Sequence, residues 1–378
     1  MKSENLAAKI ESLPLWTILL LAGLLYIPLA FLGYGSDSDA HAVVRTGQHF
    51  VSTMDYVPSR LPGFFIHEVF TYFLNLLGGS FLTNLGTIGM AILTLASFHK
   101  LCVHWNIPRP TLLTLIFMVH PIVWVSAGST IDYLWALGFA LYGFNRLIAN
   151  KYLSAVILLS LAVGCRLSTI FLVAMLIMFQ FHTSPGKRVK LLLSGIATIG
   201  LSFIFFIPPL DFLEWDFSRW LVLSTGDPTL WTPLLRAGRF LYKNLMFWGL
   251  PAALWLAVCG IMAVVHQRTI PKILFDAINL LCITVIVTYE VLFLLAPIEL
   301  EYLLPLLPFA TILLGKVFDQ KPSYLLVLFA LVLLANFLWI NPARSTSPGQ
   351  TSEVVYGLWI EKGYLLQDIA TRLAMFTP

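Results

Sequence analysis

The chain has 378 residues, of which 58% are hydrophobic and only 11% are charged, and its mean hydropathy is +0.85. Soluble domains carry about 25% charged residues, so this composition excludes an ordinary soluble protein. The net charge of +4 comes without a long basic stripe, which argues against a nucleic-acid-binding protein. The four cysteines lie in or beside apolar segments without C-x-x-C spacing, and we interpret them as small buried residues.

Apolar segments follow one another along the whole chain. Runs of about 17 residues or more are long enough to cross roughly 30 Å of hydrocarbon as helices. Backbone polar groups in lipid must be satisfied within each segment, so we predict an all-α fold, a polytopic transmembrane helical bundle. We expect about eleven membrane helices, at residues 13–33, 81–99, 111–128, 131–149, 152–166, 168–182, 191–209, 245–265, 273–296, 302–318 and 323–340.

Two stretches near the N-terminus need separate interpretation. The first membrane segment is too long for the hydrophobic region of a cleaved signal peptide, and we interpret it as a retained signal anchor. Residues 64–78 are apolar but short, and they carry His67 and Glu68 directly after Pro62-Gly63. This stretch is predicted to be an interfacial or re-entrant helix in the first external loop.

Basic residues predict the orientation in the membrane. The short connection with Lys187, Arg188 and Lys190 is expected in the cytoplasm, together with the N-terminus. Most acidic residues then lie on the opposite, external face, in the loops and in the tail. We divide the chain into a transmembrane domain at 1–340 and a short external tail at 341–378. The tail is predicted to form one amphipathic helix near 352–373.

An acidic pair follows the first membrane helix. Asp37 and Asp39 stand in Gly33-Tyr-Gly-Ser-Asp-Ser-Asp-Ala-His41, and carboxylates at i and i+2 of an extended segment point to one face. Such a pair can hold a divalent cation, Mg²⁺ or Mn²⁺, or place a general base beside a second acid. His41 is close enough to join the pair. A solvated turn with a local Asx cap has the same pattern, so the surrounding sequence has to decide.

The surrounding stretches carry a family resemblance. A membrane helix, the acidic pair and a short amphipathic helix precede Tyr56-Val-Pro-Ser-Arg60-Leu-Pro-Gly63. This order resembles the first external loop of C-type glycosyltransferases, the polytopic membrane enzymes that use polyprenyl-phosphate-linked sugars. Three later stretches resemble further motifs of that family: His120-Pro121 with Gly128 and Asp132 ahead of a helix ending in Arg146, Gly164-Cys-Arg166-Leu-Ser168, and Glu299-Leu-Glu301-Tyr302-Leu-Leu-Pro305-Leu-Leu-Pro308. The family usually has a basic residue just before the tyrosine of the last motif, where this chain has Glu301.

The resemblance implies a function for the domain at 1–340. It would transfer a sugar from a polyprenyl-phosphate-linked donor to a glycan, lipid or protein acceptor on the external face. The family resemblance also implies a hexosyl- or pentosyltransferase that inverts the anomeric centre by direct displacement. Asp37 or Asp39 would take the acceptor proton or hold a metal ion. The compact chain with its short loops favours the bacterial inner membrane.

A departing phosphate needs positive charge, and arginine presents a planar fork that suits phosphate oxygens. External arginines are notable because they run against the positive-inside trend. A charge such as Arg166 in an apolar segment needs a partner, and Asp132 is the expected one. For Arg236 and Arg239, a helix end that faces lipid headgroups is an equal alternative. The residues expected to bind substrate are His41, Arg60, Asp132, Arg166, Arg219, Arg236, Arg239, Glu299, Glu301 and Tyr302.

Two other classes of protein compete with the enzyme. A transporter or lipid-linked sugar flippase would be expected to contain internal repeats with broken helices at matching positions, and the sequence has no such repeat. A non-catalytic membrane assembly protein would not need an acidic pair beside an Arg-x-Pro-Gly turn. The sequence also has no Walker A motif and no dinucleotide-binding unit, which argues against a nucleotide-sugar donor.

Overall fold

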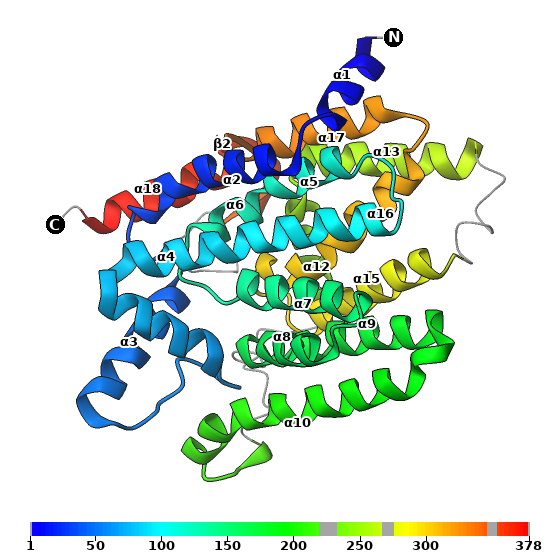
Figure 1. The fold of residues 1–378 in the computed structure, drawn as a ribbon. Coiled ribbons are helices and arrows are strands. Elements are labelled where there is room, and N and C mark those ends of the chain that lie inside the picture. The colour runs from blue at the N-terminus through cyan, green and yellow to red at the C-terminus, as the bar shows by residue number, and fades with distance from the viewer. Residues whose placement is uncertain (1, 219–232, 267–275, 346–353, 377–378) are drawn as a thin grey trace.

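The structure is a computed structural model that describes residues 2–218, 233–266, 276–345 and 354–376. It is 79% helical, which confirms the predicted all-α, polytopic helical bundle. Figure 1 shows the helices stacked side by side, with the N-terminus at the upper right of the bundle and the C-terminus at its left.

The first half of the chain forms most of the bundle. Its helices are α1 (Lys2–Glu11), α2 (Leu15–Ala30), α3 (Ser38–Thr53), α4 (Phe65–His104), α5 (Pro110–Met118), α6 (Pro121–Ala127), α7 (Tyr133–Ile148), α8 (Tyr152–Cys165), α9 (Thr169–Thr183), the short 3-10 helix η1 (Pro185–Lys187) and α10 (Arg188–Phe212). Almost every residue of α7 is buried, because α4 packs on one side of it and α8 on the other. This helix is therefore the centre of the bundle.

The second half adds helices and a β-ribbon. Its elements are α12 (Pro233–Phe247), α13 (Leu250–His266), α15 (Ala277–Leu295), the 3-10 helix η3 (Leu300–Leu306), α16 (Leu307–Val317), α17 (Pro322–Ala335), β1 (Leu338–Ser345), β2 (Val354–Lys362) and α18 (Tyr364–Phe376). Each of the eleven predicted membrane segments overlaps one described helix or two consecutive ones, but the end of the segment at 323–340 runs past α17 into β1.

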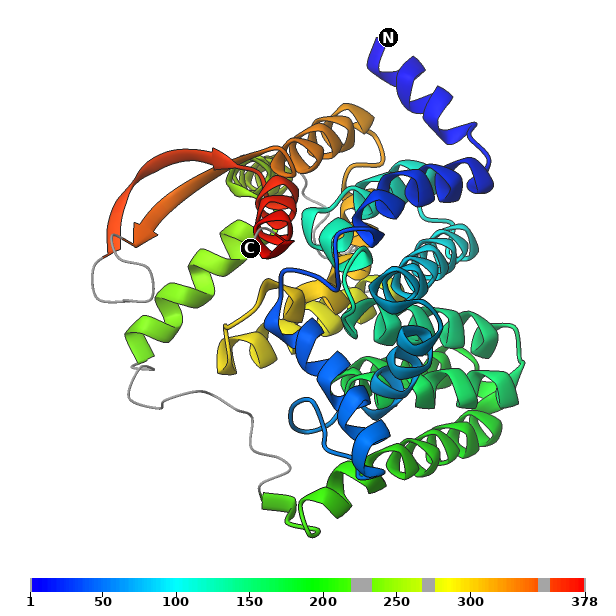
Figure 2. The same cartoon turned by 90° about the vertical axis from the view of Figure 1, so that its left-hand side faces the viewer.

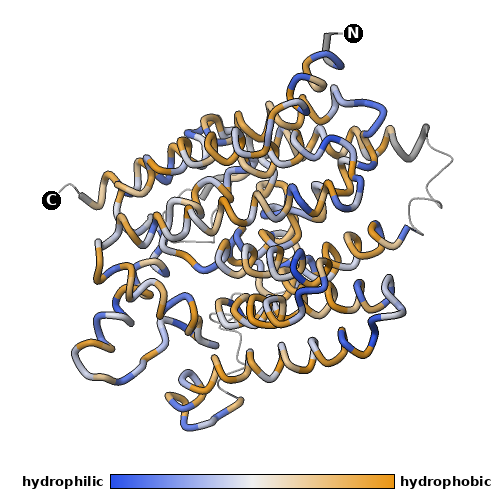
Figure 3. Tube along the Cα trace, viewed as in Figure 1, coloured by the Kyte–Doolittle hydropathy of each residue, from blue (hydrophilic) through white to orange (hydrophobic). Residues whose placement is uncertain are grey.

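The described helices differ in how they could cross a membrane. By length and composition, four spans stand alone: α4, η1 with α10, α15, and η3 with α16. Three bent pairs raise the number to seven: α1 with α2, α5 with α6, and α12 with α13. Apolar side chains of α10 such as Leu193 and Ile199 are 59% and 62% exposed, as expected for a surface against lipid. Figure 3 shows hydrophobic residues along the lengths of the helices and hydrophilic ones mainly at the connections.

The predicted interfacial stretch at 64–78 is helical and forms the first part of α4. Gly78 and Gly79 leave the helical conformation, and Gly79 has a φ of +58°, so the chain bends there before the membrane segment begins. The abutting segments at 152–166 and 168–182 are likewise separate helices, because Arg166 is extended between α8 and α9.

The prediction for the tail is wrong. Instead of one helix, β1 and β2 pair antiparallel from Leu338–Lys362 to Ser345–Val354, and only α18 is helical. Figure 2 shows the two strands extending from the helices as a curved ribbon. Gly363 separates β2 from α18, and a Cβ on it would lie 2.2 Å from the backbone of Asn336. This close approach turns the chain back onto the bundle, where α18 packs against α6.

Close helix packing at Gly164 gives a test of the fold. A Cβ on Gly164 in α8 would lie 2.6 Å from Ile66 and 2.7 Å from Phe205, whereas a Cβ on Gly200 in α10 meets no atom within 4 Å. Alanine in place of a helical glycine gains about 0.5–1 kcal/mol, but overpacking costs about 1–3 kcal/mol. We therefore expect Gly164→Ala to lower the thermal unfolding temperature in detergent and Gly200→Ala to maintain or raise it. Equal effects of the two substitutions would contradict this packing.

Candidate functional site

The loop after α2 is held firmly against the turn that precedes α7. The Asn84 side chain donates to the Gly33 carbonyl at 2.5 Å, and the Thr130 backbone N–H donates to the Tyr34 carbonyl at 2.7 Å. Gly35 has a φ of +138°, and a Cβ there would meet Ser129 at 3.2 Å. A glycine is required at this position both by the backbone conformation and by the space available. The loop therefore holds the two acidic residues that follow it, Asp37 and Asp39, at a fixed position.

The acidic pair does not form an extended segment. Asp37 is the N-cap of α3, where its carboxylate accepts the Asp39 backbone N–H at 2.9 Å, and Asp39 lies in the first helical turn. The expected Asx cap and the expected acidic pair are thus the same feature. Oxygens of Asp37, Asp39 and Glu299 all lie within 4.8 Å of one another. Glu299 comes from the connection before η3, far along the chain, so the fold creates a cluster of three carboxylates.

A chain of ion pairs stands behind this cluster. Arg60 pairs with both Asp39 and Asp132, and Arg166 Nη1 contacts Asp132 Oδ2 at 2.8 Å. Asp132 is fully buried. The expected partner of Arg166 is therefore the actual one, and Asp132 has a second partner in Arg60. The four side chains come from α3, the loop before α4, the N-cap of α7 and the α8–α9 break.

Aromatic rings cover both guanidinium groups. Arg166 lies 4.0 Å from the centre of the Tyr133 ring and 5.0 Å from that of Tyr302, and Arg60 lies 4.3 Å from that of Phe64. Such stacking leaves the edge of a guanidinium free for carboxylates while its faces are shielded from water. Because Arg166 is stacked in this way and paired with Asp132, its geometry suits a fixed positive charge behind the site.

Burial and charge act in opposite directions on two carboxyl groups. Burial raises the pKa of Asp37, and the positive charge of Arg60 only partly offsets this effect. Burial alone would also raise the pKa of Asp132, but Arg166 and Arg60 outweigh it and hold that pKa below its ordinary value. Asp132 therefore loses its proton at a lower pH than an ordinary aspartate, whereas Asp37 keeps its proton to a higher pH.

A polar cavity of about 280 Å³ opens beside the acidic cluster. Its wall includes Asp37, Glu299, Glu301 and the cation Lys243 of α12. The Tyr133 hydroxyl donates to Glu299 Oε2 at 2.5 Å, and the Tyr364 hydroxyl donates to Glu301 Oε1 at 2.8 Å. The complete lining is Ser36, Asp37, Val125, Ser126, Ser129, Ile131, Lys243, Ile298, Glu299, Leu300, Glu301 and Tyr364.

The other residues expected to bind substrate differ in position. His41 packs edge-on against the Tyr34 ring at 5.9 Å, and Tyr302 stacks on Arg166 behind the cavity. Arg236 and Arg239 lie on α12, the helix that carries Lys243, but neither is among the described residues that line the cavity. Arg219 lies outside the described residues. Tyr133 and Tyr364 were not predicted, because no local motif marks a tyrosine that bonds a distant carboxylate.

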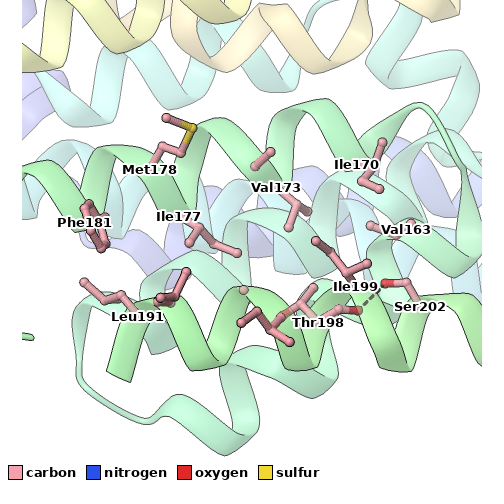
Figure 4. Close-up of a pocket in the computed structure, with 14 residues that line it drawn as sticks. Val163, Ile170, Val173, Ile177, Met178, Phe181, Leu191, Thr198, Ile199 and Ser202 are labelled. Atoms are coloured by element: carbon pink, nitrogen blue, oxygen red, sulfur yellow. Dashed lines mark hydrogen bonds between the residues drawn. The ribbon is translucent and has the colours of Figure 1, made fainter. Parts of the chain in front are cut away.

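A larger cavity of about 350 Å³ has a different character. It lies between α8, α9 and α10, and Figure 4 shows its apolar lining, with Val173, Ile177 and Ile199 facing one another. Its hydroxyl groups stay within their helix, as Ser202 donates to the Thr198 carbonyl at 2.7 Å. No titratable side chain is among its described lining residues, so it offers no group for acid–base or phosphate chemistry.

Comparisons with known proteins support the fold. No family model matches the sequence, and no curated protein matches it. ArnT from Cupriavidus metallidurans bound to undecaprenyl phosphate is similar in structure, with a TM-score of 0.57 and 15% identity over 85% of this chain and 64% of that one. The apo state of the same ArnT gives 0.54 and 14% over 81% and 60%. The chain thus spans less than two thirds of the length of ArnT.

ArnT is a C-type, lipid-linked-sugar glycosyltransferase. This chain shares the fold of ArnT, which agrees with the fold that the motif resemblance implied.

Proposed function

We propose that this protein transfers a sugar from a polyprenyl-phosphate-linked donor to an acceptor hydroxyl on the external face of the membrane. The observation that carries the proposal is the cluster of Asp37, Asp39 and Glu299. Two of its members, Asp37 and Glu299, line one polar cavity together with Lys243. The fold shared with ArnT, which was solved bound to undecaprenyl phosphate, supports the class of donor. A transporter or flippase is not favoured by the same comparison.

The geometry supports different roles for the two aspartates. Asp39 is paired with Arg60, so it orients that cation. Asp37 lines the cavity and has a raised pKa, which suits a group that accepts a proton. In the proposed reaction the acceptor oxygen attacks the anomeric carbon while its proton passes to Asp37. The bond from that carbon to the phosphate oxygen breaks, and polyprenyl phosphate leaves with the bonding electron pair.

Cations beside the cavity would stabilise the departing phosphate. Lys243 lines the cavity directly, and Arg60 stands behind the acidic pair. Positive charge held at fixed positions is effective because it needs no reorganisation as the negative charge develops. Direct displacement inverts the anomeric centre and needs no carboxylate nucleophile. We therefore assign this chain to the inverting hexosyl- or pentosyltransferases, with a glycan, lipid or protein as the acceptor.

The three clustered carboxylates also fit a divalent cation. Asp37, Asp39 and Glu299 would hold Mg²⁺ or Mn²⁺, which prefer carboxylate oxygens, although Arg60 already occupies one side of Asp39. A bound cation would act as a Lewis acid on a phosphate oxygen. Without a cation Asp37 is the proton acceptor, whereas coordination of Asp37 by a cation would make its carboxylate a weaker base.

Substitution of the acidic pair tests the proposal. In reconstituted membranes with a labelled polyprenyl-phosphate sugar, we expect Asp37→Asn to lower kcat by roughly 10²–10⁴-fold, because amides cannot accept the proton. Asp39→Asn should lower it less, since Arg60 retains Asp132. The matched control is Asp55→Asn, an exposed acid in the same loop, which should be close to wild type. Full transfer by the Asp37→Asn, Asp39→Asn double variant would rule out the catalytic assignment, and a chelator titration of the same assay tests the cation.

The pH dependence gives a second test. Because Asp37 must be ionised to accept a proton and its pKa is raised, kcat/KM should fall as the pH drops through a value above the ordinary aspartate range. The positive charge of Arg60 lowers this pKa, so Arg60→Gln should move the acid limb of the profile to higher pH. Arg60→Lys retains the charge and should leave the limb almost in place. If all three profiles shared one acid limb, Asp37 would not be the titrating base.

The proposed orientation puts the cavity outside and the connection before α10 in the cytoplasm. A cysteine at Ser52, exposed on α3, should react with a membrane-impermeant maleimide in intact cells, and one at Lys187, exposed in η1, should react only after lysis. The background is low because all four native cysteines are buried. The reverse pattern of labelling would overturn the orientation.

A further inference from the structure

One face of α18 is unusually polar for a buried surface. Arg372 is 1% exposed and Asp368 is 6% exposed, and Arg372 is the largest of the fully buried side chains in the described chain. Arginine and aspartate are almost never fully buried unless they are paired. The sequence predicts Asp368 as one of the external acids of the tail, and its burial is a finding of the structure. The burial of both residues shows that this face of α18 is built against specific partners.

Arg372 binds the turn that leads to Asp132. Its Nη1 donates to the Gly128 carbonyl at 2.6 Å, its Nη2 donates to Ser129 Oγ at 2.5 Å, and its Nε lies 2.8 Å from Asp368 Oδ2. Gly128 packs closely against α2, since a Cβ on it would lie 2.3 Å from Leu29. The arginine therefore fixes the backbone between α6 and α7, four residues before the buried anion of the site.

Asp368 and Tyr364 contact two segments of the wall of the polar cavity that contains Asp37 and Lys243. Ser36 Oγ donates to Asp368 Oδ1 at 2.5 Å, directly beside Asp37. The Tyr364 hydroxyl donates to Glu301 in η3 at 2.8 Å. Residues 364, 368 and 372 are four apart, so they lie on one face of the helix. Each of them holds a different segment of the cavity wall: η3, the Asp37 loop and the 128–129 turn.

We infer that α18 positions the catalytic loop, with Tyr364, Asp368 and Arg372 acting as a ladder that fixes the Asp37 loop relative to the Asp132 turn and η3. The catalytic part of this inference depends on the proposed function, and the structural part does not. The three residues are positioning residues, because they act on Asp37 through Ser36, Ser129 and Glu301. A displacement of about 1 Å in a reacting group can cost roughly 100-fold in rate, so loss of the ladder should appear in kcat.

The experiment combines kinetics with hydrogen exchange. For Arg372→Gln and Asp368→Asn we expect kcat to fall by about 100-fold with KM changed much less, and faster amide exchange at residues 33–39 and 126–132 than in the wild type. Arg45→Gln, an exposed arginine on α3, is the matched control and should change neither quantity. Tyr364→Phe removes a single hydroxyl and keeps the test informative if the buried charge variants fold poorly. Tyr364→Phe should lower kcat and make amide exchange in η3 faster than in the wild type.

A double-mutant cycle connects α18 directly to the loop. Ser36→Ala and Asp368→Ala should be non-additive in kcat, because each removes the same hydrogen bond. Additive effects, or unchanged exchange at 33–39 in Asp368→Ala, would overturn the ladder. Faster exchange over the whole bundle would also overturn it, because α18 would then be a general stabilising element. If the wild type transfers no sugar, the proposed function fails, and if Asp37→Asn retains full transfer, the catalytic role of Asp37 fails. In either case exchange at 33–39 alone decides whether the ladder exists.

Discussion

The buried carboxylate of Asp132 is the interaction on which the rest of the site depends. It accepts Arg60 from the first loop and Arg166 from the break between α8 and α9. Removing one member of a buried ion pair typically costs about 3–5 kcal/mol, a large part of the roughly 5–15 kcal/mol by which proteins are stable. The three segments that meet here are therefore held in one arrangement. Arg60 then extends this constraint outward, because its other partner is Asp39.

Interrupted helices make this arrangement possible within an apolar bundle. Backbone groups freed at a break must find partners inside the protein, because lipid offers none. Side chains supply them: Tyr289 donates to the Ser168 carbonyl at 3.1 Å at the α8–α9 break, and Arg372 donates to the Gly128 carbonyl after α6. The contact of Arg372 with Gly128 thus satisfies the broken backbone and also fixes a wall of the polar site. This explains why the cavity lies where several helices begin or end.

The sequence predicts the parts of this structure that depend on local pattern. Apolar runs locate the membrane helices, and an intramembrane arginine requires an acidic partner, which makes the Arg166–Asp132 pair predictable. The geometry of Asp37 and Asp39 was not predictable, because D-x-D fits an extended segment and a helix N-cap equally well. The bond between Ser36 and Asp368 joins residues 332 positions apart, and no local pattern reports it. The strands β1 and β2 were missed because each pairs with a separate segment of the chain, and the local pattern does not report such a partner.

The charge balance of the site explains why a donor phosphate could bind where acids are clustered. Five carboxyl groups, those of Asp37, Asp39, Asp132, Glu299 and Glu301, stand against three cations, Arg60, Arg166 and Lys243. Fully ionised, this set would be net negative and would repel a phosphate. Burial raises the pKa of Asp37, which reduces that charge. Tyr133 and Tyr364 donate hydrogen bonds that disperse, but do not remove, the charge of Glu299 and Glu301. A divalent cation at the three clustered carboxylates would cancel the remainder, so the need for one is set by how many of these acids stay ionised when the donor is bound.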